Sequence, residues 1–289
     1  MKAAGAALIA PAKVNLALHV TGRRADGYHL LDSVAVFAEL GDRVEIAPAE
    51  HLEARVSGPF AAHAPGDRGN LAWRAAEAFF RHTGRPPAAS IGVEKNIPAG
   101  AGLGGGSADA AAVLRALNAF TGADVALSDL RAIGLTLGAD VPMCLSSCAL
   151  RARGIGEDIA PVEGWPALPM VLVWPGRAVP TLAVFSGLAS RENPPLPDLP
   201  SADHTSVAEI AAWLGACRND LEPPALQIAP EIAVALDALR TTDGCLVARM
   251  SGSGSACFGL YAEQGEAAAA AARLAAAQPA WWVKATTAR

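Results

Sequence analysis

The sequence lacks the cysteine spacing of a zinc site or a disulfide framework. Its few cysteines are odd in number, and no two show the C-x-x-C pattern. They are Cys144, Cys148, Cys217, Cys245 and Cys257. So few cysteines in 289 residues predict a reduced cytoplasmic protein.

Positive charge and long apolar runs are also scarce. The net charge is −5 and no basic run occurs, so we expect no nucleic-acid partner. No apolar run approaches the roughly 20 residues of a membrane span, so we expect no membrane partner. Residues 1–12 faintly resemble a signal peptide, but their apolar stretch is mostly Ala and Gly, which favours the cytoplasm. These features indicate a protein that handles small molecules.

Hydrophobic periodicity predicts the elements of the first half of the chain. Strands are expected over 8–20, 34–37, 43–46 and 90–97, and helices over 71–82 and 108–120. Residues 21–28 are expected to form a loop. Gly41 and Asp42 are predicted to form the turn between the two short strands, and Gly122 the end of the second helix.

The second half differs in texture from about Gly164. Strands are expected over 168–174, 245–250 and 256–261, and helices over 207–216, 231–239 and 266–277, with a proline-rich loop over 192–200. Strands and helices without strict βαβ alternation favour an α+β fold in two lobes. We place the lobes at residues 1–160 and 161–289.

The segment P-A-G-A-G-L-G-G-G-S-A-D, residues 98–109, has five glycines within seven residues. Glycine allows backbone N–H groups to turn toward one point, and Ser107 is a suitable N-cap for the helix behind it. A helix N-terminus behind such a loop binds anions, most often phosphate. The alternative, a flexible linker, does not fit a position between a predicted strand and a strong helix.

The common phosphate motifs do not match. Gly106 is followed by Ser107 without the lysine of a P-loop, and the G-x-G-x-x-G pattern formed by Gly100, Gly102 and Gly105 lacks an acidic residue at a later strand end, because Asp124 lies in an expected loop. The V-A-I-K, H-R-D and D-F-G motifs of protein kinases are missing.

The chain has only four lysines against 19 arginines, which singles out Lys13 and Lys95. A lysine retained in such a sequence is a candidate for a task that needs a compact ammonium, although solvation of a surface is the alternative for both. Asp140, in G-A-D-V-P, is either functional or an ordinary turn aspartate.

Three segments together resemble the motifs of the GHMP kinases: P-A-K-V-N-L-A-L at 11–18, the glycine segment, and M-S-G-S-G-S-A at 250–256. G-R-R-A-D-G-Y-H at 22–29, G-A-D-V-P at 138–142, V-P-T at 179–181 and the pair Asn219 and Asp220 make the chain most similar to the branch that phosphorylates a cytidine diphosphate-linked methylerythritol in non-mevalonate isoprenoid synthesis.

This resemblance implies a two-lobed α+β kinase with the active site in a cleft between the lobes. ATP, accompanied by Mg²⁺, would give its γ-phosphoryl group to the 2-hydroxyl of the methylerythritol moiety. Lys13 and Asp140 would be the catalytic pair. Asn15, Tyr28 and His29 would lie on the substrate side, with Phe185 stacked on the far face of the cytosine. The ATP site would comprise Lys95 and Pro98, Ala99, Gly100, Ala101, Gly102, Leu103, Gly104, Gly105, Gly106, Ser107 and Ala108.

Two other functions remain open. A sister GHMP kinase acting on homoserine or mevalonate would keep the glycine segment but not the Tyr28–His29 pair. A nucleotide-binding regulator that has lost catalysis would not need Lys13 and Asp140. The sequence points to no carboxylate ligand for Mg²⁺, and either a monomer or a homodimer is compatible with it.

Overall fold

The computed structural model describes residues 6–65, 68–200 and 205–289. These form two compact units, each assembled from separated stretches of chain. The first contains residues up to Ala12 together with Leu40–Ala99 and Gly104–Ser147, and the second contains Lys13–Glu39, Gly100–Leu103 and Cys148–Arg289. The expected lobe boundary near residue 160 stays a prediction.

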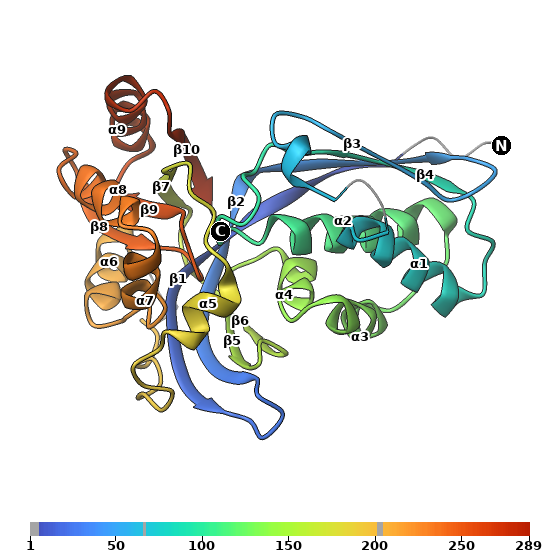
Figure 1. Ribbon diagram of the computed structural model, residues 1–289, viewed down its shortest axis with the longest axis horizontal. Helices are drawn as coiled ribbons and strands as arrows, with labels where there is room; N and C mark the ends of the chain where they lie inside the picture. Colours follow the sequence, from blue (N-terminus) through green and yellow to red (C-terminus); the bar gives the residue numbers. More distant parts are fainter. Residues whose placement is uncertain (1–5, 66–67, 201–204) are drawn as a thin grey trace. The chain divides into compact units, whose positions relative to one another are not determined.

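The elements of the first unit are strands β3 (Glu53–Ser57) and β4 (Ala89–Glu94), the short 3₁₀ helix η1 (Ala61–His63) and helices α1 (Leu71–Thr83), α2 (Gly105–Thr121), α3 (Leu127–Leu137) and α4 (Val141–Ser146). Strands β1 (Ala6–Arg23) and β2 (His29–Pro48) contribute residues to both units. In the first unit β4 pairs antiparallel with the end of β2 and parallel with β3. Helices α1 to α4 cover one face of these strands (Figure 1).

The elements of the second unit are strands β5 (Leu150–Gly154), β6 (Asp158–Pro161), β7 (Leu168–Trp174), β8 (Cys245–Met250), β9 (Cys257–Tyr261) and β10 (Trp282–Ala288), and helices α5 (Thr181–Ser186), α6 (Val207–Gly215), α7 (Glu222–Ile228), α8 (Glu231–Arg240) and α9 (Gln264–Ala277). The order β2-β10-β7-β9-β8 is antiparallel throughout, and β5 pairs with β2 and β6. Helices α8 and α9 pack on these strands over the core of the unit.

Most expected elements are confirmed with small shifts of their ends, including α1, β7, β8 and the left-handed Gly122 that ends α2. Strand β1 runs to Arg23, so the loop expected over 21–28 is shorter. Residues 6–12 of the weak signal-peptide pattern form the start of β1, and residues 1–5 lie outside the described residues.

The predicted turn at Gly41 and Asp42 is wrong, because β2 runs unbroken through both residues. A Cβ at Gly41 would lie 2.1 Å from the carbonyl oxygen of Ala10, so glycine is needed here for a close backbone approach. Asp42 is completely buried and accepts hydrogen bonds from the backbone N–H groups of Asn96 and Ile97. A dipeptide typical of turns therefore serves tertiary contacts inside a strand.

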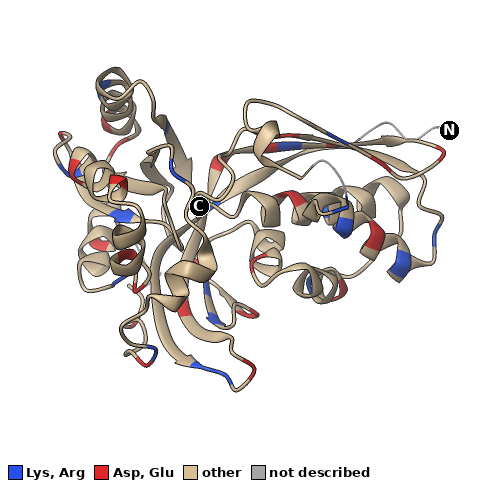
Figure 2. Cartoon of the chain, in the orientation of Figure 1, with Lys and Arg blue, Asp and Glu red and all other residues tan. Residues whose placement is uncertain are grey.

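Acidic and basic residues are interspersed along the elements of each unit (Figure 2). Within the described residues, no helix combines the length and apolar character needed to cross a bilayer.

Candidate active site

The glycine segment is an ordered turn between β4 and α2. Gly100, Gly102 and Gly104 have φ angles of 67°, 77° and 65°. Gly104 is the N-cap of α2, so the expectation that Ser107 is the N-cap is wrong, and Ser107 lies inside the first turn. The helix begins earlier because a left-handed glycine can end the loop without a capping side chain. The first intrahelical bond runs from Ala108 N to Gly104 O, so the preceding N–H groups of the first turn are oriented to bind an anion.

The third motif packs directly on the backbone of this segment. A Cβ at Gly102 would lie 2.5 Å from the carbonyl oxygen of Ser251 and 2.8 Å from the amide nitrogen of Gly254. Ser251 Oγ donates to Gly102 O at 3.1 Å, and Ala256 N donates to Ala101 O at 2.9 Å. The two glycine-rich loops are therefore held together by contacts between their main chains, a pairing that no sequence pattern predicts.

The first motif, residues 11–18, contacts both of these loops. Lys13 N donates to Leu103 O at 2.9 Å, and Asn15 N donates to Ser251 Oγ at 3.1 Å. The Lys13 side chain is 4% exposed, which rules out the alternative that this lysine solvates a surface. All of these contacts lie within the second unit, so the three motifs converge there.

Asp140 lies in the first unit, at the start of α4. It occupies the N-cap position and is half-buried, yet its carboxylate does not cap the helix. It lies in the turn between α3 and α4, which is closed by the hydrogen bond from Val141 N to Gly138 O, so the alternative of an ordinary turn aspartate stays open beside the functional one. Its pairing with Lys13 stays a prediction.

The residues expected on the substrate side lie in the second unit. The rings of His29 and Phe185, from β2 and α5, are stacked with centroids 4.8 Å apart and planes inclined by 25°. Tyr28, next to His29, is 58% exposed. The structure thus brings together two rings that lie 156 positions apart in the sequence. Asn15 is buried and donates to Ser33 Oγ at 2.8 Å, and its Oδ1 has no hydrogen-bond partner among the described residues.

The surroundings of His29 favour the neutral form of its imidazole. Burial lowers the pKa of its imidazole, and the nearby guanidinium groups of Arg23 and Arg191 lower it further. Its Nε2 is buried and has no hydrogen-bond partner within the part of the chain that the structure describes. A neutral imidazole with an unused nitrogen, stacked on an aromatic ring, suits a planar polar ligand.

Comparison with known proteins identifies the family. Residues 70–147 match the N terminal domain of GHMP kinases, and residues 196–280 match the GHMP kinase C terminal domain. The 4-diphosphocytidyl-2-C-methyl-D-erythritol kinase of Mesorhizobium japonicum is 52% identical over 280 residues, which cover 96% of this chain and 94% of that protein. The chain belongs to the GHMP kinase family. As a GHMP kinase it is a small-molecule kinase that uses ATP.

Solved structures agree with this assignment. A crystal structure of a 4-(cytidine 5'-diphospho)-2C-methyl-D-erythritol kinase superposes with a TM-score of 0.80 at 39% identity, covering 98% of this chain and 99% of that one. Homoserine kinase from Cytophaga hutchinsonii superposes with a TM-score of 0.72 at 18% identity, covering 98% and 94% of the two chains, and shares the fold. The expected α+β GHMP kinase fold is confirmed.

Lys95 of this GHMP kinase is buried between two carboxylates. Its Nζ donates to Asp42 and to Asp109, all within the first unit. Neither aspartate is predicted as a site residue from the sequence, because Asp42 has the pattern of a turn and Asp109 only ends the glycine segment. Burial opposes the charge of Lys95, but Asp109 and Asp42 raise its pKa, so the ammonium stays charged. Solvation of a surface is excluded for Lys95, and its contact with ATP stays a prediction.

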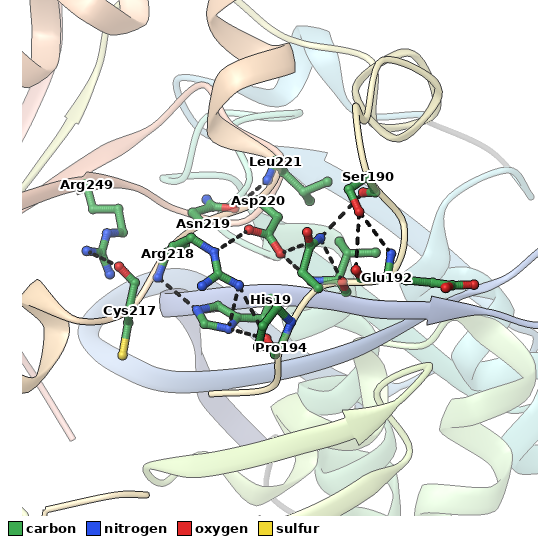
Figure 3. Close-up of polar contacts among 12 residues, drawn as sticks. His19, Ser190, Glu192, Pro194, Cys217, Arg218, Asn219, Asp220, Leu221 and Arg249 are labelled. Carbon is green, nitrogen blue, oxygen red and sulfur yellow. Dashed lines mark hydrogen bonds and ion pairs between the residues drawn. The ribbon is translucent and has the colours of Figure 1, made fainter. Parts of the chain in front are cut away.

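A polar network anchors the segment after α5, here called the strap (residues 190–200). Figure 3 shows His19 on β1 between Arg218 and Pro194. Arg218 N donates to His19 Nε2 at 2.9 Å, so the ring proton is on Nδ1, which donates to Pro194 O at 2.9 Å. Burial and then the Arg218 charge lower the pKa of His19, although the Pro194 carbonyl opposes the shift. A neutral histidine therefore joins β1 to the strap.

Other contacts fix the strap at further points. Asn193 donates to Val20 O from its backbone N–H, at 3.1 Å, and its side chain donates to Asp220 Oδ2, also at 3.1 Å. Asp220 Oδ2 accepts from Val20 N at 2.8 Å. Leu196 N donates to Asp32 Oδ2 at 3.1 Å. Asp220 belongs to the Asn219–Asp220 pair noted in the sequence, and the structure assigns it a role in positioning the strap.

Among the described residues, no group of three His, Cys, Asp or Glu side chains forms a metal site.

Proposed function

We propose that this GHMP kinase transfers the γ-phosphoryl group of ATP to the 2-hydroxyl of 4-diphosphocytidyl-2-C-methyl-D-erythritol, in non-mevalonate isoprenoid precursor synthesis. The observation that carries the choice of acceptor is the stacking of His29 on Phe185 beside the exposed Tyr28. Aromatic faces stack on a nucleobase, and a neutral imidazole can hydrogen-bond to the polar edge of cytosine.

The glycine segment is proposed to hold the phosphates of ATP. Its left-handed glycines and the first-turn N–H groups of α2 offer main-chain donors and the positive end of the helix dipole. Mg²⁺ bound to the nucleotide would offset phosphate charge, and we propose that the phosphates themselves are its main ligands.

Lys13 and Asp140 are the proposed catalytic pair. Phosphoryl transfer has a loose transition state, so catalysis depends on alignment and on stabilising charge. The Asp140 carboxylate would orient the 2-hydroxyl and accept its proton late in the reaction. The Lys13 ammonium would keep that carboxylate ionised and stabilise the charge on the transferred group.

The reaction's cosubstrate is a cytoplasmic nucleotide, so we propose a cytoplasmic location. The oligomeric state, monomer or homodimer, stays a prediction.

The test is a ³¹P NMR assay of the purified chain with MgATP and each of three acceptors: the cytidylyl substrate, homoserine and mevalonate. Transfer to the cytidylyl acceptor, with a new phosphomonoester signal, is expected. Transfer only to homoserine or mevalonate would identify a sister kinase. ATP binding without transfer to any of the three would favour the regulator hypothesis and contradict the roles of Lys13 and Asp140.

A further inference from the structure

A buried cluster with unbalanced charge lies beneath the first turn of α2. The single ammonium of Lys95 is shared by Oδ2 of Asp42 and, at 2.5 Å, by Oδ2 of Asp109. The side chains of Lys95, Asp42 and Asp109 are 5%, 0% and 3% exposed. With both carboxylates ionised, the cluster has one more negative charge than positive charge, in a region almost closed to solvent.

The cluster contacts the chain at both ends of the loop formed by the glycine segment. A Cβ at Gly105, the first residue of α2, would lie 3.4 Å from Asp42 Oδ2 and 3.5 Å from Lys95 Nζ. Asp42 Oδ1 accepts from Asn96 N at 2.5 Å and from Ile97 N at 2.8 Å, just before the segment begins. The three side chains thus support the chain that enters the glycine segment and the helix that leaves it.

Asp109 is the member of the cluster with incomplete hydrogen bonding. Its Oδ1 is buried and has no hydrogen-bond partner among residues 6–65, 68–200 and 205–289. The charged groups that face it are Lys95, just after β4, and Asp42 on β2. The buried faces of α1, α3 and α4, which pack on α2, add only apolar residues, glycine and the Cys144 thiol. An ionised carboxylate with an unsatisfied buried oxygen is costly.

Electrostatics agrees with this geometry. Burial raises the pKa of Asp109 to about 7, with Lys95 opposing the shift and Asp42 adding to it. Once protonated, Asp109 can also hydrogen-bond to Asp42. The protonation state of Asp109 is therefore sensitive near neutral pH to any new negative charge brought close to it.

We propose that the Lys95–Asp42–Asp109 cluster positions the glycine segment. When a nucleoside triphosphate binds at the first turn of α2, the Asp109 carboxylate of this cluster takes up a proton from solvent. This inference rests on the proposed function, since it requires phosphates at that turn. Their negative charge repels the excess negative charge of the cluster through a medium of low dielectric constant, and the added proton removes the repulsion. In this role Lys95 and Asp109 act through the loop that holds the phosphates.

The test is isothermal titration calorimetry of the full chain with the Mg²⁺ complex of a non-hydrolysable ATP analogue. At pH 7.5, the binding heats measured in HEPES and in Tris differ by the number of protons exchanged multiplied by the difference between the ionisation enthalpies of the two buffers. We expect uptake of roughly half a proton per nucleotide for the wild type and close to none for Asp109→Asn. Asp129→Asn is the matched control, because Asp129 is exposed in the first turn of α3 and should leave the uptake unchanged.

A second variant covers the case in which Asp109→Asn does not fold. Asp42→Asn leaves Lys95 paired with Asp109 alone, which favours ionised Asp109, so its proton uptake should also disappear. The wild-type affinity should fall by up to about tenfold between pH 6 and pH 9, a pH dependence that a purely structural cluster would not produce. Nucleotide binding without proton uptake, or equal uptake by Asp109→Asn, would overturn this inference and leave the kinase assignment intact. Failure to bind the nucleotide at all would contradict the ATP site itself.

Discussion

The contact between the two glycine-rich loops gives the sharpest prediction, through the substitution Gly102→Ala. The new Cβ would lie 2.5 Å, 2.8 Å and 3.0 Å from Ser251 O, Gly254 N and Gly254 O, which are all backbone atoms and cannot rotate away. A left-handed φ of 77° costs an alanine about 1–2 kcal/mol. Overpacking adds about 1–3 kcal/mol. Together the substitution should lower the free energy of unfolding by about 2–5 kcal/mol, less whatever the loops recover by moving apart.

Gly122→Ala is the matched control. Gly122 also has a positive φ, 58°, but a Cβ there would have no neighbour within 4 Å among the described residues. It should therefore show only the backbone cost of about 1–2 kcal/mol. Urea unfolding followed by circular dichroism measures both variants, and the KM for ATP reports any movement of the glycine segment. We expect the KM to rise at least about tenfold for Gly102→Ala, equivalent to 1.4 kcal/mol, and to be unchanged for Gly122→Ala. Equal unfolding costs, with normal KM values in both, would refute the close packing of the two loops.

Three further predictions follow from the site. Asp140→Asn should lower kcat by roughly 10²-fold or more while nucleotide affinity, measured by titration, stays close to wild type; normal turnover would remove Asp140 from the mechanism. Tyr28→Ala should weaken binding of the cytidylyl substrate by about 1–3 kcal/mol and spare ATP, whereas Leu182→Ala, at the 83% exposed Leu182, should change neither; equal losses for both ligands would contradict the placement of Tyr28. Burial raises the pKa of Asp32, but the bidentate hydrogen bonds from Arg151 outweigh the effect of burial, so the net pKa is lowered. This pair therefore stabilises the protein at pH values above the ordinary pKa of Asp, and the stabilisation is lost as the pH falls through the lowered pKa. Asp32→Asn should therefore cost about 3 kcal/mol at pH 7 and progressively less in acid, and a pH-independent difference in urea unfolding would disprove this.

Local patterns predicted the helices and strands well, because burying one face of a helix or strand places apolar residues at a regular spacing in the sequence. The residues of α1 and β7 are clear examples, and Gly122 marked the end of α2. The three motifs that resemble those of the GHMP kinases also predicted the family correctly. These features depend on neighbours a few positions away along the chain.

Features set by distant parts of the chain could not be predicted in the same way. Gly41 looks like a turn residue, but its partner is the backbone of Ala10, far outside any local window. Ser107 was a reasonable N-cap until Gly104 was found to end the loop three residues earlier. The importance of Asp42 depends on Lys95, and no periodicity links these two residues.

The strap shows how a composition typical of a linker can conceal a fixed structure. Residues 190–200 contain four prolines, yet hydrogen bonds to β1, to the loop before α7 and to Asp32 on β2 hold the path of the chain just after Phe185. Of these three hydrogen bonds, only the one to Asp220 uses a side chain of the strap, that of Asn193, whereas those to His19 and Asp32 come from the strap backbone. A replacement for this stretch therefore has to keep the path of its backbone and the amide group of Asn193 if these anchors are to be retained.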